Sequence, residues 1–314
     1  MSQEELFSDL PIVWLELNFD LDETPPWLAS ASGETENKIS IDEVLSEIVN
    51  FSRQYATASA TNDARNKILK AMKDEFIYRM AVEEDVGLQD AAQSREIINS
   101  NDALHARKSR RPREQETVNM YQALEHFTDK FTEMESTGLL DEEYVLEGHQ
   151  ILMRDTSHPN GGKFSQFKRT TYYDGEVHEY PDPKTIAPAH AAIIDQANEL
   201  MTHISATYDR YSPDRVLSTV KLASWLLFNY VSLHPFGDGN GRMCRLLCSY
   251  VLSTLAPFPT PIYNIHAASR KSDYIDSIVA TRKSESRRPV LLATMLLECF
   301  WKSWRHLHQK LTEI

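Results

Sequence analysis

The feature that most constrains this chain is a twelve-residue stretch, His-Pro-Phe-Gly-Asp-Gly-Asn-Gly-Arg-Met-Cys-Arg, at residues 234–245. An apolar run at 222–233 precedes it, and a second at 246–252 follows it without Gly or Pro. Both runs are too short to span a bilayer. The sequence therefore predicts two buried helices joined by a glycine-rich turn.

The turn contains residue types that bind phosphate groups. Gly237, Gly239 and Gly241 permit positive backbone dihedral angles, so successive N–H groups can point into one hollow at the start of a helix. Arg242 and Arg245 are three residues apart, so they share a face of that helix. Their guanidinium groups can bind the outer phosphates of a nucleotide.

Two further side chains add reactive chemistry. Asp238 can hold Mg²⁺ or Mn²⁺, since Mg²⁺ prefers a carboxylate together with phosphate oxygens and water. His234 is the only group in the stretch that can accept a proton near neutral pH. A glycine-rich turn alone is more commonly structural, but the joint pattern indicates phosphoryl or nucleotidyl transfer.

At this level of detail the stretch resembles the Fic family signature, His-x-Phe-x-Asp/Glu-Gly-Asn-Gly-Arg-x-x-Arg, with every fixed position present. The resemblance implies a helical domain that transfers AMP from ATP, the co-substrate, to a Ser, Thr or Tyr hydroxyl of a target protein. By position it makes His234 the base, Phe236 a core anchor of the loop and Asp238 the metal ligand. The residues it assigns to the nucleotide phosphates are Gly237, Gly239, Asn240, Gly241, Arg242 and Arg245.

Residues 164–183 form the one β-like segment of the sequence. Strand-forming residues on either side of Asp174-Gly175 predict a hairpin. The resemblance places a flap here, whose open edge would hold the target segment by backbone pairing. The flap residues expected to contact the target are Arg169, Thr170, Thr171 and Tyr172.

Many Fic proteins carry an inhibitory helix with the pattern Ser/Thr-x-x-x-Glu-Gly/Asn. Its glutamate pairs with the second arginine of the motif and blocks productive ATP binding. By resemblance this helix falls near residues 90–103, where Ser94 and Asn99 fit but Ile98 occupies the glutamate position. Because isoleucine cannot pair with Arg245, the sequence predicts weak or absent self-inhibition. A shifted register using Glu96, or an ordinary amphipathic helix, remains the alternative.

The predicted fold is all-α, a Fic-type helical bundle with a small β-hairpin flap. Residues 1–115 are predicted to form an N-terminal helical region, beginning with a capping box at Ser40, and 116–314 the catalytic domain. Trp14 and Trp27 are expected to anchor the N-terminal segment. A net charge of −13, from 33 Lys and Arg against 46 Asp and Glu, argues against general nucleic-acid binding.

The first residues are acidic and show no signal peptide, and no apolar run is long enough for a membrane span. A cytoplasmic protein is expected. The basic segment 105–113 is interpreted as a solvated linker, with nuclear import as the alternative. A homodimer and a nucleobase pocket lined by Tyr274 are left open. Two other functions also stay open: removal of AMP from a modified protein, and nucleotide binding without turnover.

Overall fold

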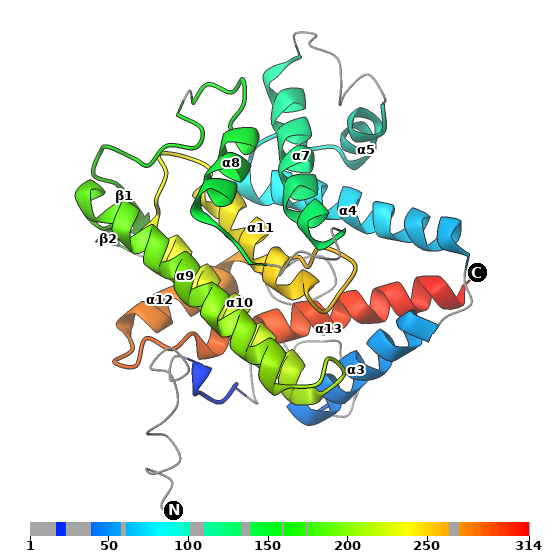
Figure 1. Cartoon of the computed structure of the whole chain (residues 1–314). Helices are drawn as coiled ribbons and strands as arrows, with labels where there is room; N and C mark the ends of the chain where they lie inside the picture. Colours follow the sequence, from blue (N-terminus) through cyan, green and yellow to red (C-terminus); the bar gives the residue numbers. More distant parts are fainter. Residues whose placement is uncertain are drawn as a thin grey trace, which may run out of the picture.

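The computed structural model describes residues 17–22, 39–57, 61–100, 110–132, 139–158, 160–173, 175–263 and 270–313. These residues form a bundle of helices with one small two-stranded sheet (Figure 1). The predicted all-α fold with a β-hairpin is confirmed. The expected anchors Trp14 and Trp27 lie outside the described residues.

Helices α10 (Pro213–Leu233) and α11 (Asn240–Ser253) lie at the centre of the bundle and pack against each other. Nearly every side chain of α11 is buried, and α10 is buried over most of its surface. Among the described residues, only α10 is long and apolar enough to cross a membrane, and 67% of its apolar window is buried inside the protein. Burial on almost all sides is typical of a core helix.

The other helices that follow residue 111 surround this pair. α9 packs along α10, α7 packs against α8 and α11, and α13 crosses α10 and α12. α9 begins at Pro183, because Asp182 caps it and Pro183 occupies its first turn. The bounds are α7 Pro112–Thr132, α8 Glu142–Leu152, α9 Pro183–Thr207, α12 Lys271–Lys283 and α13 Val290–Thr312.

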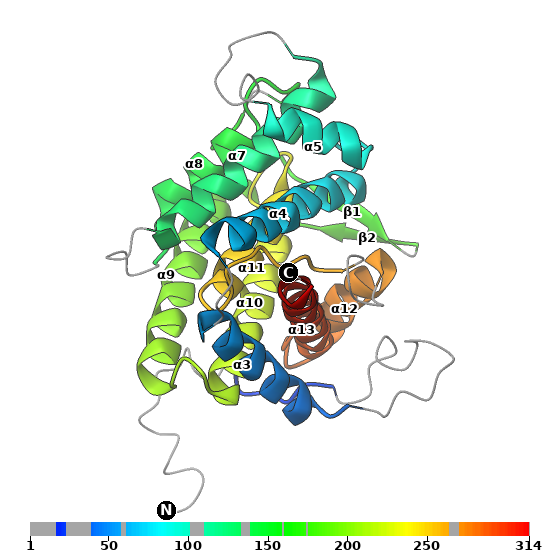
Figure 2. The same ribbon diagram turned by 90° about the vertical axis from the view of Figure 1, so that its right-hand side faces the viewer.

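The N-terminal helices pack onto this bundle and share its hydrophobic core. α3 (Ile41–Thr57) lies against α13 and α10, while α4 (Asn62–Glu84) crosses α7, α11 and α13 (Figure 2). The predicted capping box is present: the Glu43 carboxylate accepts the Ser40 backbone N–H at 2.8 Å, and Ser40 Oγ accepts the Glu43 N–H at 3.2 Å. The short α5 (Ala91–Asn99) packs on α4 and α7.

The predicted hairpin is formed by β1 (Thr170–Tyr173) and β2 (Glu176–Glu179), which pair antiparallel. Gly175, in the turn between them, has a φ of 80°, which explains the glycine there. The sheet projects from the bundle beside α12 (Figure 2). Tyr173 Oη donates to the Asp276 carboxylate of α12, and Lys283 of α12 pairs with Glu176 at 3.1 Å. The hairpin is thus tied to the helix next to it.

Candidate active site

The motif forms the connection between the two central helices, as predicted. α10 ends at Leu233, and His234 caps it in the left-handed region, with φ 50° and its N–H donating to the Tyr230 carbonyl at 3.0 Å. Gly239 has φ 77° and caps the start of α11. A Cβ on Gly239 would also meet His149 Nε2 at 3.2 Å. Of the three motif glycines, which all permit a positive φ, only Gly239 has one.

The loop is fixed from the inside by Phe236 and Asn240. Phe236 is fully buried, as expected. The Asn240 side chain accepts the Phe236 N–H at 3.0 Å and donates to the Phe236 carbonyl at 2.8 Å. Both polar atoms of this amide are therefore used inside the loop. The backbone N–H of Asn240, at the start of α11, can still serve the phosphate-binding role expected of this residue.

A histidine that the sequence analysis did not identify supports the same loop. His149 of α8 is buried and stacks on Phe236, with ring centroids 3.6 Å apart and planes 7° apart. Its Nδ1 accepts the Gly162 N–H at 2.9 Å, so its Nε2 donates to the Asp238 carbonyl, 3.0 Å away. Burial lowers the pKa of His149 to about 4, which keeps the ring neutral in this role.

The N-terminus of α11 offers backbone donors to an anion. The first intrahelical bond runs from the Met243 N–H to the Gly239 carbonyl at 2.9 Å. The N–H groups of Asn240, Gly241 and Arg242 come before it and lack helical acceptors, so they can bind a negatively charged group. A Cβ on Gly241 would lie only 2.5 and 2.6 Å from the two Glu84 carboxylate oxygens. The Glu84 carboxylate thus lies directly against this helix start.

Glu84 also forms the ion pair of the second motif arginine. Nε of Arg245 donates to Glu84 Oε1 at 3.1 Å, and Nη2 of Arg245 lies 3.1 Å from the same oxygen. The guanidinium carbon of Arg245 lies 4.7 Å from the ring centroid of Tyr263 and 5.8 Å from that of Tyr274. Tyr274 is buried within this wall around Arg245. Glu84 therefore contacts the guanidinium group that the sequence analysis expected to bind an outer phosphate.

This arrangement corrects the expectation about residue 98. Ile98 is buried in α5 and belongs to the hydrophobic core. The carboxylate on Arg245 comes instead from Glu84, the last residue of α4. The backbone on both sides of Glu84 is held as well, since Lys271 Nζ donates to the Glu83 carbonyl and the Gly87 N–H donates to Glu116 at 2.8 Å. Arg245 is therefore paired with a glutamate, which comes from a helix other than the one the sequence indicated.

His234 lies beneath the base of the hairpin. Its ring stacks on Tyr180, with centroids 4.0 Å apart and planes 17° apart. Burial and the nearby Arg169 guanidinium lower the pKa of His234 to about 4, while Asp238 opposes the shift. The ring is therefore neutral at pH 7 and can accept a proton.

The expected target-binding residues of the hairpin divide into two groups. Thr170, Thr171 and Tyr172 are exposed on β1. Arg169 instead closes the base of the hairpin: its Nη2 donates to the Pro181 carbonyl at 2.8 Å, and its own carbonyl accepts the Tyr180 N–H at 3.0 Å. Arg169 thus stabilises the base of the hairpin and lowers the pKa of His234, while the other three residues are exposed to solvent.

Asp238 is the candidate metal ligand. Its Oδ2 accepts from Arg242 Nη2 at 3.0 Å, and His158 Nε2 lies 3.7 Å from the same oxygen. The described residues contain no cluster of three or more His, Cys, Asp or Glu side chains suited to a metal. A cation here would therefore depend on one half-exposed carboxylate together with phosphate oxygens and water, a donor set that fits nucleotide-bound Mg²⁺.

Comparison with known proteins agrees with this geometry. The model of the Fic/DOC family matches residues 139–252, which include the motif loop and both central helices. Residues 139–252 belong to the Fic/DOC family. A Fido domain-containing protein of Dictyostelium discoideum is 42% identical over 83 residues, 26% of this chain and 54% of that protein. The chain thus spans about half the length of this relative.

Solved Fic structures share the fold beyond the matched segment. A Fic domain containing signaling protein from Bacteroides thetaiotaomicron superposes with a TM-score of 0.67 at 18% identity, covering 86% of this chain and 97% of that one. Fic-1 from C. elegans superposes with a TM-score of 0.65 at 16% identity, covering 87% of this chain and 73% of that one. α4 and its Glu84 lie outside the 139–252 Fic segment.

Proposed function

We propose that this chain transfers AMP from ATP to a Ser, Thr or Tyr hydroxyl of a target protein and releases pyrophosphate. Fic domains typically transfer a nucleoside monophosphate to a protein. The observation that carries the proposal is the pairing of a neutral, partly buried His234 with a helix start whose N–H groups can bind an anion, both on one short loop. These are the two elements that nucleotidyl transfer to a hydroxyl requires.

In the proposed reaction the N–H groups at the start of α11 and the guanidinium of Arg245 bind the triphosphate. The exposed edge of β1 holds the target segment so that its hydroxyl faces the α-phosphorus. His234 takes the hydroxyl proton as the new O–P bond forms and the bond to pyrophosphate breaks. Mg²⁺, when held by Asp238 and the phosphates, would neutralise the charge that develops on the leaving group.

Glu84 would oppose the binding of ATP in this reaction. Its carboxylate already occupies the helix start and Arg245, so a triphosphate has to displace it. By the same resemblance that predicted an inhibitory glutamate, Glu84 is its candidate here. We therefore expect low transfer activity in the unmodified chain, whereas the sequence predicted weak or absent self-inhibition.

The test is label transfer from α-³²P-ATP to proteins of a cell lysate, followed by mass spectrometry of the labelled band. Glu84→Ala should label one or more proteins, and Glu84→Ala combined with His234→Ala should label none while folding normally. Full labelling by the double variant would eliminate His234 as the base. Absence of labelling with Glu84→Ala would remove the transferase proposal itself.

A second function, removal of AMP from a modified protein, is favoured by the presence of Glu84. By resemblance to the family, this reversal depends on the inhibitory glutamate, a role for which Glu84 is the candidate here. The two activities respond oppositely to one change. Glu84→Ala should raise transfer, whereas it should abolish release of AMP from a protein that has already been labelled.

A further inference from the structure

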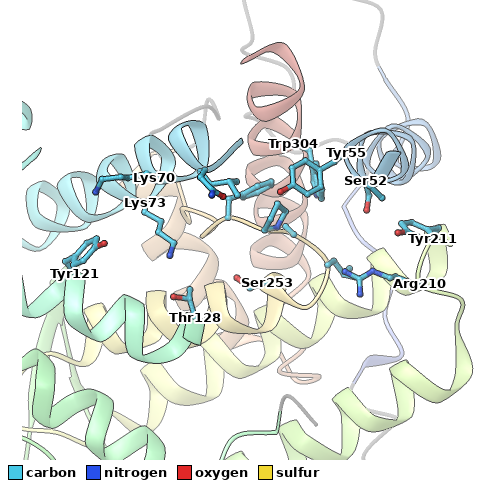
Figure 3. Close-up of a pocket in the computed structure, with 17 residues that line it drawn as sticks. Ser52, Tyr55, Lys70, Lys73, Tyr121, Thr128, Arg210, Tyr211, Ser253 and Trp304 are labelled. Carbon is cyan, nitrogen blue, oxygen red and sulfur yellow. The ribbon is translucent and has the colours of Figure 1, made fainter. Parts of the chain in front are cut away.

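A second site lies away from the motif, under the N-terminal half of α4. It is a pocket of about 680 Å³ between α3, α4, α7, α13 and the segments that precede α10 and follow α11 (Figure 3). Ligand sites for small molecules commonly have volumes of this order. None of the residues that line it belongs to the 234–245 motif.

The residues that line the pocket carry positive charge, although the protein as a whole is acidic. It includes Lys70, Lys73 and Arg210 but no Asp or Glu among the described residues, in a chain whose net charge is −13. Lys73 pairs with Glu125 of α7 at 2.7 Å, and Lys70 lies 3.9 Å from Asp74. For Arg210 the described part of the chain shows neither an ion pair nor a hydrogen bond. Its guanidinium points toward the pocket from the turn before α10 (Figure 3).

Aromatic rings form much of the remaining wall. Trp304 and Tyr55 meet edge to face, with centroids 6.2 Å apart, at the end where α3 and α13 approach. Tyr121 and Tyr211 line the opposite ends of the pocket (Figure 3). Aromatic walls with a few convergent charged groups suit a planar ligand that carries an acidic group.

The N-terminal part of α4, which lies above the pocket, has no fully buried side chain to hold it on the bundle. The first ten residues of α4, 62–71, include no buried side chain, whereas the later part buries a continuous stripe from Met72 onward. An occupant that contacts Lys70 and Lys73 from below, and Arg210 across the pocket, would tie this end of α4 to the bundle.

We propose that this pocket binds a small organic anion with a planar ring system, and that the bound anion holds α4 in the position seen here. Because α4 continues as one helix from the pocket to Glu84, about 16 Å beyond Lys73 at 1.5 Å per residue, the same position keeps Glu84 on Arg245. A ligand that prefers this conformation increases its population. The ligand is therefore an effector that weakens ATP binding, a step that rests on the proposed function.

Binding is tested with 8-anilinonaphthalene-1-sulfonate as the probe, by fluorescence titration of the full chain. Arg210→Gln should weaken saturable binding about tenfold, the loss expected for one charge-assisted contact. Lys67→Gln, an exposed change on α4 outside the pocket, should leave it unaltered. N-phenyl-1-naphthylamine, which has the same rings without the sulfonate, should bind much more weakly. Equal binding by Arg210→Gln, or equal binding of the neutral analogue, would overturn the site.

Coupling to Glu84 is tested by the affinity of ATP with Mg²⁺ in the His234→Ala background, which prevents turnover. Saturating anilinonaphthalenesulfonate should weaken ATP binding, and ATP should weaken probe binding by the same factor. Both effects should vanish when Glu84→Ala is added. If the probe binds but leaves the ATP affinity unchanged, the effector role is refuted. A chain that binds the probe and labels no protein keeps this site while losing the proposed transferase function.

Discussion

Replacing Glu84 with alanine should make the chain bind ATP with Mg²⁺ about thirtyfold more tightly. In the structure Arg245 and Glu84 have side chains only 7% and 25% exposed, and Glu84 also lies against the N-terminus of α11. A hydrogen bond to a charged group in such surroundings contributes about 2 kcal/mol, and this amount no longer has to be overcome when the glutamate is absent. At about 1.4 kcal/mol per tenfold, that free energy corresponds to a factor of about thirty.

The measurement is isothermal titration calorimetry in the His234→Ala background. The matched control is Glu75→Ala, which removes the same charge from the same helix but breaks only the surface pair with Arg79, 3.7 Å apart. Glu75→Ala should leave the dissociation constant within about twofold, since surface pairs contribute little. A Glu84→Ala dissociation constant within twofold of the parent would show that Glu84 does not compete with the phosphates. An equal increase in ATP affinity in Glu84→Ala and Glu75→Ala would show that the change in net charge alone is responsible.

Three further outcomes follow from the histidines. His149→Ala should lower the free energy of unfolding by about 3 kcal/mol, since it removes two hydrogen bonds and a ring stack; thermal unfolding within 1 °C of the parent would contradict this. Transfer by Glu84→Ala should stay flat from pH 8 to about 6 and fall only toward pH 4, because burial lowers the pKa of His234 to about 4; a midpoint near 6.5 would contradict it. Burial lowers the pKa of His149 and His190 to about 4 as well. Their contribution to stability is complete above about pH 6.5, the unfolded value, and should be lost as pH falls from there toward 4, which thermal melts across that range would detect.

Local signals in the sequence predicted the parts of the site that local backbone chemistry determines. The glycine-rich loop between two apolar runs, the Asp-Gly hairpin and the Ser40 capping box depend on residues within a few positions of one another. Short-range hydrogen bonds and the conformational freedom of glycine are properties of such segments themselves. This is why their locations were predicted correctly even though only Gly239 uses a positive φ.

The partner of Arg245 could not be found in this way, because the pair joins residues 161 positions apart. In sequence, Glu84 is part of a Glu-Glu-Asp run that looks like a solvated helix end. The structure shows what the search pattern overlooked. Asp85, the residue after Glu84, caps α4 in the left-handed region with φ 50°. Gly and Asn are favoured there for that conformation, and Asp tolerates it too. Glu84 departs from the inhibitory pattern at a second position as well, because Met80 stands four residues before it, where the pattern has Ser or Thr.

His149 was missed for a different reason. It lies on the buried face of α8 between Val145 and Leu152, where a helical pattern is interpreted as core packing. Its two hydrogen bonds go to backbone groups of segments far along the chain, the Asp238 carbonyl and the Gly162 N–H. A histidine on an otherwise apolar helix face is a signal of a satisfied polar contact, but the sequence does not indicate which loop supplies it.

The start of α11 and Arg245 form the proposed phosphate site, and Glu84 occupies the same groups. Transfer activity and its inhibition by Glu84 are therefore expected to depend on one set of contacts. A negative group of suitable size is attracted by the free N–H groups and by the guanidinium of Arg245. Gly241 has no side chain, so it leaves space for such a group. Glu84 is tethered to the same molecule, and a tethered group acts at an effective concentration of at least the millimolar range. Free ATP therefore competes with a partner that never diffuses away. It follows that the stability of the α4 position determines the fraction of molecules in which Glu84 has left the phosphate site and ATP can bind. The contact of Lys73 with Glu125, which lies on α4 away from the motif, is then expected to tune nucleotide binding without touching the nucleotide.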